Sequence, residues 1–310
     1  MERMKRKIRI ALPSKGLLAE GSTKLLADVG LPVYKPNPRQ YIAWIPRLPD
    51  VEVIFQRPGD IVISVRDGSV DFGITGLDIY LEKRDSNGQI LDLHRQLGFG
   101  KCSLNVVVPD KWQDIETIAD LKTYQTSLGR SLKVATKFPK LAIEYFQSKT
   151  HIPIEVIEAE GALEIAPTIG YADLIVDLVS TGTTLRDNRL RTLSDGKILD
   201  AEACLIANQN QLATDDQTLQ TAKFLLEMFS AHLRGKQNLA IFANIRAKSE
   251  AEITGKIFQQ DVISGLQGPT ISRILTQGDD EFFAIHIAAT SCDQCQGQSR
   301  KCNCTHICFL

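Results

Sequence analysis

The 310-residue sequence has no apolar run long enough to cross a membrane and almost no net charge. A transmembrane helix needs about 20 consecutive apolar residues. The basic start, residues 1–10, precedes too few apolar residues for the core of a signal peptide. A net charge of −1 gives no electrostatic basis for binding nucleic acid or an anionic membrane. We therefore expect a cytoplasmic protein with neither nucleic acid nor membrane as a partner.

Signature motifs of several common enzyme classes are missing too. The sequence has no Walker A loop and no GxGxxG stretch, so any nucleotide must be bound in another way. No serine occupies a nucleophile elbow. The five histidines lack the spacing of a metal site; they are His94, His151, His232, His286 and His306. These absences argue against hydrolase chemistry and against the usual nucleotide-binding loops.

Cysteine is scarce over most of the chain and crowded at its end. Cys102 and Cys204 stand alone in apolar contexts and are expected to be buried thiols. The other five are Cys292, Cys295, Cys302, Cys304 and Cys308. The first four of these are candidate zinc ligands, since Cys292 and Cys295 have the spacing of a zinc-binding pair. Two other interpretations stay open: an unstructured tail with incidental thiols, and an end unrelated to the preceding domain, such as a shifted reading frame.

Apolar segments of strand length alternate with helical patterns, which is typical of α/β proteins. We expect residues 32–49 to form a loop, and residues 111–121 and 162–169 to form helices. RIALPSKGLLAEGSTKLL resembles KVATKFPKLAIEYF, and DGSVDFGITGLD resembles IGYADLIVDLVSTG. This internal repeat predicts two similar α/β lobes that face each other across a cleft lined by polar turns. The alternative is a chance likeness between α/β segments.

The most informative stretch is ADLIVDLVSTGTTLRDN, residues 172–188. A buried strand ends near Asp177, and a turn of small, hydroxyl-rich residues follows: Ser180, Thr181, Gly182, Thr183 and Thr184. The backbone N–H groups and hydroxyls of such a turn suit a phosphate. An acidic residue at the strand end suits a ribose diol. The turn is equally compatible with a plain helix N-cap.

Further polar residues occupy the other turns of the two halves. They are the cations Lys15, Arg57 and Lys137, the turn Thr75–Gly76, and the carboxylates Asp78, Glu160, Glu164 and Asp177. This combination indicates a polyanionic ligand that carries a sugar.

Six segments resemble one known family: RIALPSKG, DFGITGLD, LGFGKC, VATKFP, EGALEIAP and DLIVDLVSTGTTLRDN. They are similar to ATP phosphoribosyltransferase, the first enzyme of histidine biosynthesis, and the resemblance runs from residue 7 to about residue 210. It implies a glycosyltransferase with a two-lobed fold like that of periplasmic binding proteins. A non-catalytic small-molecule-binding or sensor protein of the same two-lobed fold is the alternative function.

The resemblance also implies the reaction. The adenine N1 of ATP attacks the anomeric carbon of Mg²⁺-bound phosphoribosyl pyrophosphate, and pyrophosphate leaves with inversion. The 5′-phosphate lies on Ser180–Thr184 and the ribose hydroxyls on Asp177. The remaining roles are pyrophosphate binding by Lys15, Lys137 and Arg57, ATP binding by Thr75, Gly76 and Asp78, and action near the sugar carbon or the adenine amino group by Glu160 and Glu164.

The chain departs from the family pattern in its cations. Family members commonly have arginine at the position of Leu17 and within residues 142–144. Each lost charge-assisted contact to a polyanion is worth roughly 1.5–3 kcal/mol. Lys140 and Arg39 are the candidates to compensate.

The last third resembles the extra domain of the long form of this enzyme, which works as a homohexamer without a separate regulatory subunit. For this chain we expect a homo-oligomer, a hexamer or a dimer. LQGPTIS and FFAIHI match an ACT-like module that binds histidine as feedback inhibitor, with Leu266, Gly268 and Thr270 as candidate ligands. The polar sequence after it lacks the further helix and strand of such a module, so we expect an incomplete domain. The expected domains are lobe I, residues 1–100 and 181–212; lobe II, 101–180; the ACT-like domain, 213–290; and the cysteine-rich tail, 291–310.

Overall fold

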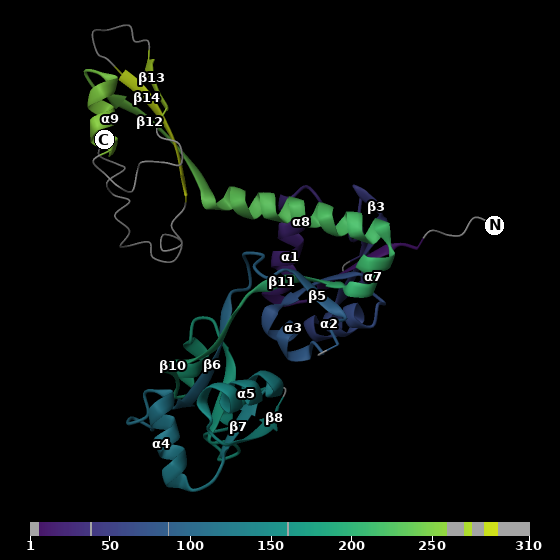
Figure 1. Ribbon diagram of the computed structural model, residues 1–310, viewed down its shortest axis with the longest axis vertical. Coiled ribbons are helices and arrows are strands. Elements are labelled where there is room, and N and C mark those ends of the chain that lie inside the picture. Colours follow the sequence, from purple (N-terminus) through teal and green to yellow (C-terminus); the bar gives the residue numbers. More distant parts are fainter. Residues whose placement is uncertain are drawn as a thin grey trace, which may run out of the picture. The chain divides into compact units, whose positions relative to one another are not determined.

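The structure, a computed structural model, describes residues 6–258, 270–274 and 282–290, apart from Pro38, Ser86 and Glu160. The chain divides into two compact units, Met1–Phe229 and Ser230–Leu310. Figure 1 shows the first unit built around two sheets and the second around one. Among the described residues, no helix is long and apolar enough to cross a membrane.

The first sheet of the first unit, which belongs to lobe I, has six strands. In order across the sheet they are β2 (Ile42–Ile45), β3 (Leu48–Gln56), β1 (Ile8–Pro13), β4 (Phe72–Gly76), β11 (Ala203–Asn208) and β5 (Ile90–His94). β1 runs parallel to β3 and to β4, so these three strands end at one edge of the sheet. That common carboxyl edge is where an open α/β sheet places its ligands.

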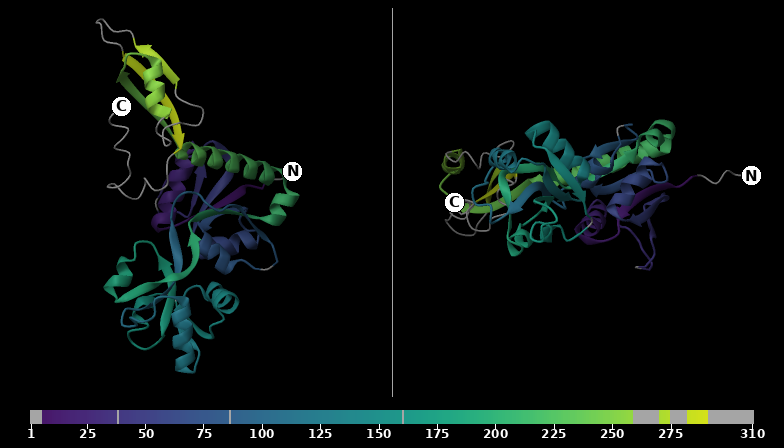
Figure 2. Two further views of the ribbon diagram at one scale, coloured as in Figure 1. Left: turned by 60° about the vertical axis from the view of Figure 1, so that its left-hand side comes forward. Right: turned by 90° about the horizontal axis from the view of Figure 1, so that it is seen from below.

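Helices cover both faces of this sheet, as the two views of Figure 2 show. Because side chains alternate along a strand, Ile10 and Leu12 enter one core and Ala11 enters the other. The helices of the first core are α1 (Gly16–Asp28) and the start of α8 (Asp216–Gln237). Those of the second are α2 (Pro58–Arg66) and α3 (Leu77–Lys83).

The second sheet, that of lobe II, has five strands. In order they are β10 (Leu190–Ala201), β6 (Cys102–Pro109), β9 (Leu174–Val179), β7 (Leu132–Thr136) and β8 (Ile154–Glu158). β7 runs parallel to β8 and β9, and these three strands again share a carboxyl edge. The helical segments of this lobe are α4 (Ile118–Leu128), α5 (Pro139–Tyr145), the π-helical turn η1 (Phe146–Thr150), the 3₁₀ turn η2 (Leu163–Ile165) and α6 (Thr183–Asp187).

The α/β class and the two lobes predicted from the sequence are confirmed, but several local predictions are wrong. Residues 32–49 contain β2 and the start of β3. The helix expected at 111–121 starts only at Ile118, because Thr117 and Asp120 form a capping box there. The helix expected at 162–169 is only a 3₁₀ turn, preceded by Ala162 at φ 53°. The chain also returns to the first sheet with β11 rather than at residue 181, since β10 stays in the second.

The second unit contains a three-stranded antiparallel sheet in the order β12 (Asn238–Arg246), β14 (Phe282–Thr290), β13 (Thr270–Ile274). The helix α9 (Glu250–Phe258) follows β12 in the chain. Ile245, Ile253 and Phe283 belong to its apolar core. The described elements of this unit therefore follow one another in the order β-α-β-β.

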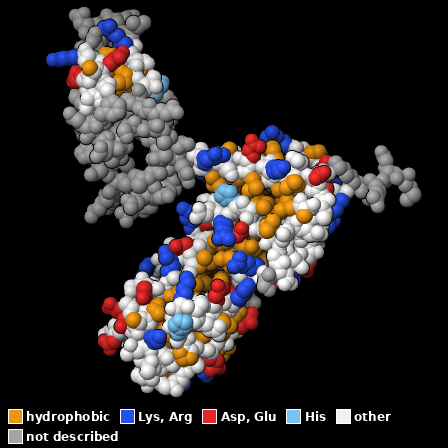
Figure 3. Space-filling view, viewed as in Figure 1, with side chains coloured by type: hydrophobic (Ala, Val, Ile, Leu, Met, Phe, Trp, Pro, Cys, Tyr) orange, Lys and Arg blue, Asp and Glu red, His pale blue; other side chains and the backbone are white. Residues whose placement is uncertain are grey.

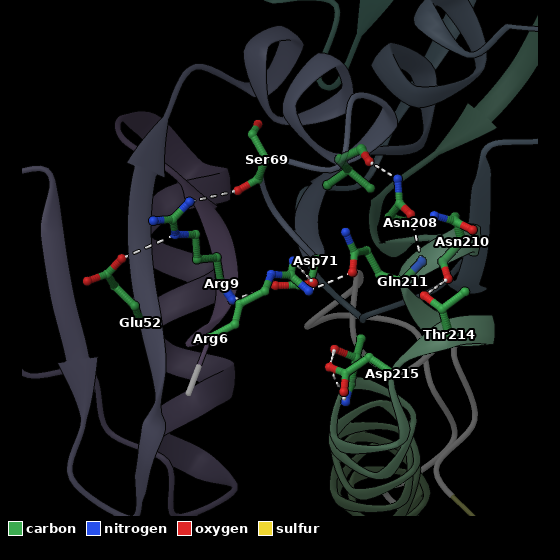
Figure 4. Close-up of polar contacts among 12 residues, drawn as sticks. Arg6, Arg9, Glu52, Ser69, Asp71, Asn208, Asn210, Gln211, Thr214 and Asp215 are labelled. Carbon is green, nitrogen blue, oxygen red and sulfur yellow. Dashed lines mark hydrogen bonds and ion pairs between the residues drawn. The ribbon is translucent and has the colours of Figure 1, made fainter. Parts of the chain in front are cut away.

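A buried polar network closes the amino edge of the first sheet (Figure 4). Asp71, which immediately precedes β4, has no exposed surface, and its carboxylate accepts from Arg6 Nη2 at 2.6 Å and from Arg9 N at 2.8 Å. Arg6 also donates to Gln211 in α7 (Gln209–Thr214), at 2.6 Å. Asn208 caps α7 by accepting from the Gln211 N–H. These bonds join the start of β1, the start of β4 and the end of β11.

Candidate functional site

Two exposed cations follow parallel strands at the carboxyl edge of the first sheet. Lys15 is the N-cap residue of α1, just after β1, and Arg57 is the N-cap residue of α2, just after β3. The two strands end side by side, with Pro13 opposite Gln56. No hydrogen bond or ion pair of either cationic side chain occurs among the residues that the structure describes. Both charges are thus available to an anion.

The Thr75–Gly76 turn ends β4 at the same edge. The Thr75 side chain is fully buried, and its hydroxyl donates to the Pro58 carbonyl at 3.1 Å. Asp78, only 4% exposed, lies beside Gly76, where a Cβ would collide with its carboxylate. Burial raises the pKa of Asp78 above its ordinary value, although the N–H of Ile79 partly offsets this. Both side chains are enclosed within the lobe, and they fix the shape of the turn.

Lys137 and Asp177 meet at the carboxyl edge of the second sheet. Thr136, the last residue of β7, lies opposite Val176 of β9. The residues that follow these two are therefore close to each other: Lys137, which is exposed, and Asp177, which is half-buried. The Thr136 hydroxyl donates to the Val176 carbonyl at 2.7 Å and accepts from the Phe138 N–H at 2.9 Å. One buried hydroxyl therefore holds the lysine turn against the aspartate strand.

The surroundings of Asp177 disfavour its negative charge. Its pKa is raised mainly by burial and further by the nearby Glu164 carboxylate, whereas the Leu178 N–H and the Lys137 ammonium lower it. Asp177 Oδ1 accepts from that N–H at 2.8 Å. Glu164 reaches this position from η2. Two carboxylates and an ammonium thus share one small region, where a cation or a hydroxyl-bearing ligand would relieve the repulsion.

The hydroxyl-rich turn Ser180–Thr184 lies mostly exposed directly after β9. Gly182 adopts φ 69°, a left-handed conformation that favours glycine. The Thr181 and Thr183 hydroxyls are 3.1 Å apart. Arg186 of α6 donates to the Thr183 hydroxyl at 3.3 Å and to the Thr181 carbonyl at 3.5 Å. The turn therefore presents a guanidinium and several hydroxyls at one place.

Two of these contributors were not recognised from the sequence. Thr136 lies one residue before Lys137 and shapes the lysine turn through its hydroxyl. Its position at the end of a strand is the feature of the sequence that could have indicated this role. Arg186 lies three residues after Thr183, the spacing at which side chains meet on a helix. Its guanidinium adds a positive charge to a turn that the sequence described only by its hydroxyls.

The remaining predicted residues lie partly outside and partly inside the described part of the chain. Glu160, Leu266, Gly268 and the five terminal cysteines lie outside the described residues. Thr270 is exposed at the start of β13. Cys204 is buried and Cys102 is half-buried, and burial raises the pKa of the Cys102 thiol to about 11. These two thiols are protonated at neutral pH, as expected of inert cysteines.

On the face that Figure 3 draws, the lysine, arginine and acidic side chains are interspersed rather than segregated. Within the part of the chain that the structure describes, no group of three or more His, Cys, Asp or Glu side chains is placed to hold a metal ion. A divalent cation at this site would need ligands from its substrate as well as from the protein.

Comparison with known proteins identifies the family. The family model of ATP phosphoribosyltransferase matches residues 57–230. ATP phosphoribosyltransferase 2, chloroplastic, of Arabidopsis thaliana is 39% identical over 287 residues, 90% of this chain and 70% of the relative. The ATP phosphoribosyltransferase of Mesorhizobium japonicum is 38% identical over 69% of this chain and 95% of its own.

A solved structure agrees with the sequence relatives. The ATP phosphoribosyl transferase (HisG:HisZ) complex from Thermotoga maritima matches with a TM-score of 0.56 and 25% identity, over 74% of this chain and 99% of that one. The aligned sequences, the family model and the fold all lead to one assignment. The chain belongs to the ATP phosphoribosyltransferase family.

Proposed function

We propose that the chain joins adenine N1 of ATP to the anomeric carbon of phosphoribosyl pyrophosphate at the carboxyl edges of its two sheets, releasing pyrophosphate. This is the family reaction and the first step of histidine biosynthesis. The observation that carries the assignment of the site is the continuity of Asp177 with the exposed Ser180–Thr184 turn, beside Lys137. A carboxylate, a hydroxyl-rich turn and a cation match a ribose, its 5′-phosphate and the leaving group.

The 5′-phosphate lies on the turn Ser180–Thr184 in this proposal. The hydroxyls of Thr181 and Thr183 and the backbone N–H groups around Gly182 are the donors, and Arg186 adds a charge-assisted bond. Asp177 accepts from the ribose hydroxyls. These bonds hold the sugar so that its anomeric carbon is presented in one orientation, and alignment of this kind accounts for much of the rate of a two-substrate reaction.

The pyrophosphate end requires positive charge. Lys137 lies beside Asp177, and Lys15 and Arg57 at the edge of the first sheet have no side-chain partner within the described part of the chain. Their role is to stabilise the charge that develops on the departing pyrophosphate. Mg²⁺ fits the carboxylates Asp177 and Glu164 as hard oxygen ligands, with the substrate completing its coordination. When bound, it neutralises the pyrophosphate.

ATP approaches from the first sheet in this proposal. The turn Thr75–Gly76 and the adjoining Asp78 set the shape of that surface from inside the lobe. Glu164, and Glu160 beyond the described residues, are the candidates to accept a hydrogen bond from the adenine amino group. Because the attacking group is a neutral ring nitrogen, the protein needs no covalent intermediate.

The departures from the family pattern bear on affinity for the pyrophosphate. Leu17, where relatives commonly have arginine, is 74% exposed, so a side chain there reaches solvent or ligand rather than the core. Lys140, a candidate to compensate, already donates to the Arg84 carbonyl at 2.7 Å. Arg39 remains exposed in the segment before β2. In this proposal, most of the positive charge that meets the pyrophosphate therefore comes from Lys15, Arg57 and Lys137.

The test is direct. The protein is mixed with ATP, Mg²⁺ and phosphoribosyl pyrophosphate, and the ultraviolet absorbance of the adduct is followed. We expect adduct with ATP and none with N1-methyl-ATP, in which the nucleophile is blocked. No adduct from folded protein would overturn the proposal in favour of the binding-protein alternative.

Assembly, regulation and location are further parts of the proposal. We infer a homo-oligomer, a hexamer or a dimer, because the edge strand β2 exposes Ile42 and Trp44; light scattering after gel filtration measures its mass. Residues 213–290 are the candidate for histidine feedback, with Thr270 exposed on β13. A thermal-shift titration with histidine checks this, and an unchanged melting temperature at saturation contradicts it. The cytoplasmic location stays a prediction.

A further inference from the structure

The two sheets of the first unit are joined by a reciprocal contact between the ends of two helices. α5, in the second lobe, has no side-chain cap of its own: Phe138 is its N-cap residue and Pro139 its first. The free N–H groups of Lys140 and Leu141 instead donate to Glu82 of α3, at 2.9 Å and 3.0 Å. A carboxylate at a helix N-terminus satisfies otherwise unpaired donors and complements the helix dipole.

The opposite helix end is matched in the same way. The Lys140 ammonium donates to the carbonyl of Arg84, the C-cap residue of α3, at 2.7 Å. A carboxylate of α3, that of Glu82, thus caps the start of α5, and an ammonium of α5, that of Lys140, binds the end of α3. Ile79 of α3 packs against the cores of both lobes, which adds an apolar part to the contact.

Both helices begin at turns that the proposed function uses. α3 begins directly after Thr75–Gly76, and α5 begins two residues after Lys137. A displacement of one helix relative to the other therefore moves the lysine turn relative to the turn that meets ATP. Because Lys137 is one of the cations proposed to bind phosphoribosyl pyrophosphate, such a displacement weakens its charge-assisted contact to that substrate.

We propose that Glu82 is a positioning residue, which holds the Lys137 turn of the second sheet at a set distance from the Thr75–Gly76 turn of the first. It touches neither substrate. It acts by accepting the two N–H groups at the start of α5, with Lys140 as the second half of the contact. This inference rests on the proposed function for its effect on kinetics, but not for the contact itself.

Kinetics of full-length variants test the effect on the reaction. For Glu82→Ala we expect the KM for phosphoribosyl pyrophosphate to rise about tenfold, since Lys137 is no longer held in place and makes a weaker charge-assisted contact to this substrate, with kcat changed less than about threefold. Glu82→Gln keeps one acceptor oxygen and restores part of the KM. Lys140→Met gives a smaller rise. Glu20→Ala, which removes an exposed carboxylate from α1, is the matched control and leaves KM unchanged.

Hydrogen exchange in the substrate-free protein tests the contact independently of activity. The amides of Lys140 and Leu141 are expected to exchange faster in Glu82→Ala and at the wild-type rate in Glu20→Ala. Unchanged exchange, or faster exchange with wild-type KM values, overturns the proposal. An inactive wild-type protein whose Glu82→Ala variant still shows faster exchange refutes the proposed function and retains the interlobe contact.

Discussion

The two edges of the first sheet use polar residues in opposite ways. At the amino edge, the carboxylate of Asp71 is fully buried and accepts from Arg6 and from a backbone N–H (Figure 4). At the carboxyl edge, Lys15 and Arg57 are exposed and their charges have no partner among the described residues. The same chain segment supplies both edges, since β1 starts beside one and ends beside the other.

The second sheet repeats this difference within a single strand. Asp173, immediately before β9, pairs with Arg130 at 2.7 Å, and the pair lowers the pKa of its carboxyl. Asp177, near the end of β9, is half-buried beside another carboxylate, and its pKa is raised. A carboxyl whose pKa is lowered by a partner in the folded state favours folding when charged, whereas one whose pKa is raised is a candidate for a functional site. The comparison therefore contrasts a residue that supports the fold with one proposed to meet a ligand.

The largest expected effect is on activity at the carboxyl edge. Asp177→Asn removes the charge that is proposed to accept the ribose hydroxyls, and we expect kcat/KM to fall about 10²–10³-fold, the usual loss for one preorganised polar contact. Steady-state kinetics with phosphoribosyl pyrophosphate as the varied substrate measures it. Asp173→Asn is the control at the other end of the strand. It should cost stability but leave turnover of the folded enzyme near normal; similar kinetics for both variants would break the comparison.

The next effect is on stability at the amino edge. Asp71→Asn removes the charge partner of Arg6, and we expect the free energy of unfolding to fall by about 1.5–3 kcal/mol. The lower part of the range is favoured because the Arg6 side chain is 47% exposed and can turn to water. Urea denaturation measures the loss. A variant as stable as the wild type would show that this network is not what holds the edge.

The residues of the proposed site stand out in the sequence more clearly than the contacts that support them. Asp177 and the Ser180–Thr184 turn could be proposed from the sequence because their residue types are close together in the chain and unusual in combination. The strand β2 was missed because the prolines around it suggested a loop, whereas Trp44 and Ile42 pair with β3. The contact of Glu82 with Lys140 joins residues 58 positions apart, and no local pattern announces it.

The η2 segment shows a second limit of the sequence. The apolar spacing of residues 162–169 is helical, but Ala162 takes a left-handed conformation and the helix fails to extend. Backbone strain at a residue with a Cβ depends on the surrounding fold, so spacing alone cannot reveal it. The consequence is local and useful: η2 directs Glu164 to the region of Asp177.

A smaller effect tests whether the phosphate turn depends on its backbone conformation. Gly182→Ala and Gly129→Ala both place a Cβ at a left-handed residue, with φ 69° and 68°. The added Cβ meets Arg186 Nη1 in ordinary contact at 3.6 Å at Gly182, and nothing within 4 Å at Gly129. Each should lose about 1–2 kcal/mol of stability from that strain. Only Gly182→Ala, in the Ser180–Thr184 turn, should also raise the KM for phosphoribosyl pyrophosphate. Equal KM values for the two variants would remove the turn from the site.

The smallest expected effect is a gain in stability on replacing Asp177, the residue whose replacement is expected to reduce activity most. A raised pKa in the folded state means that the carboxyl of Asp177 favours folding when protonated and disfavours it when charged. The penalty is absent below the ordinary value of 3.8, develops as the pH rises through the raised pKa, and is constant above it.

Asp177→Asn lacks the charge, so we expect it to melt at a higher temperature than the wild type at pH 7, with the difference vanishing towards pH 3.8. Asp173→Asn should behave oppositely, because its partner Arg130 lowers the pKa and the native charge stabilises the fold at neutral pH. Melting curves across this pH range compare the two variants. If both change the melting temperature in the same direction at pH 7, the two ends of β9 do not differ as the charges around them imply.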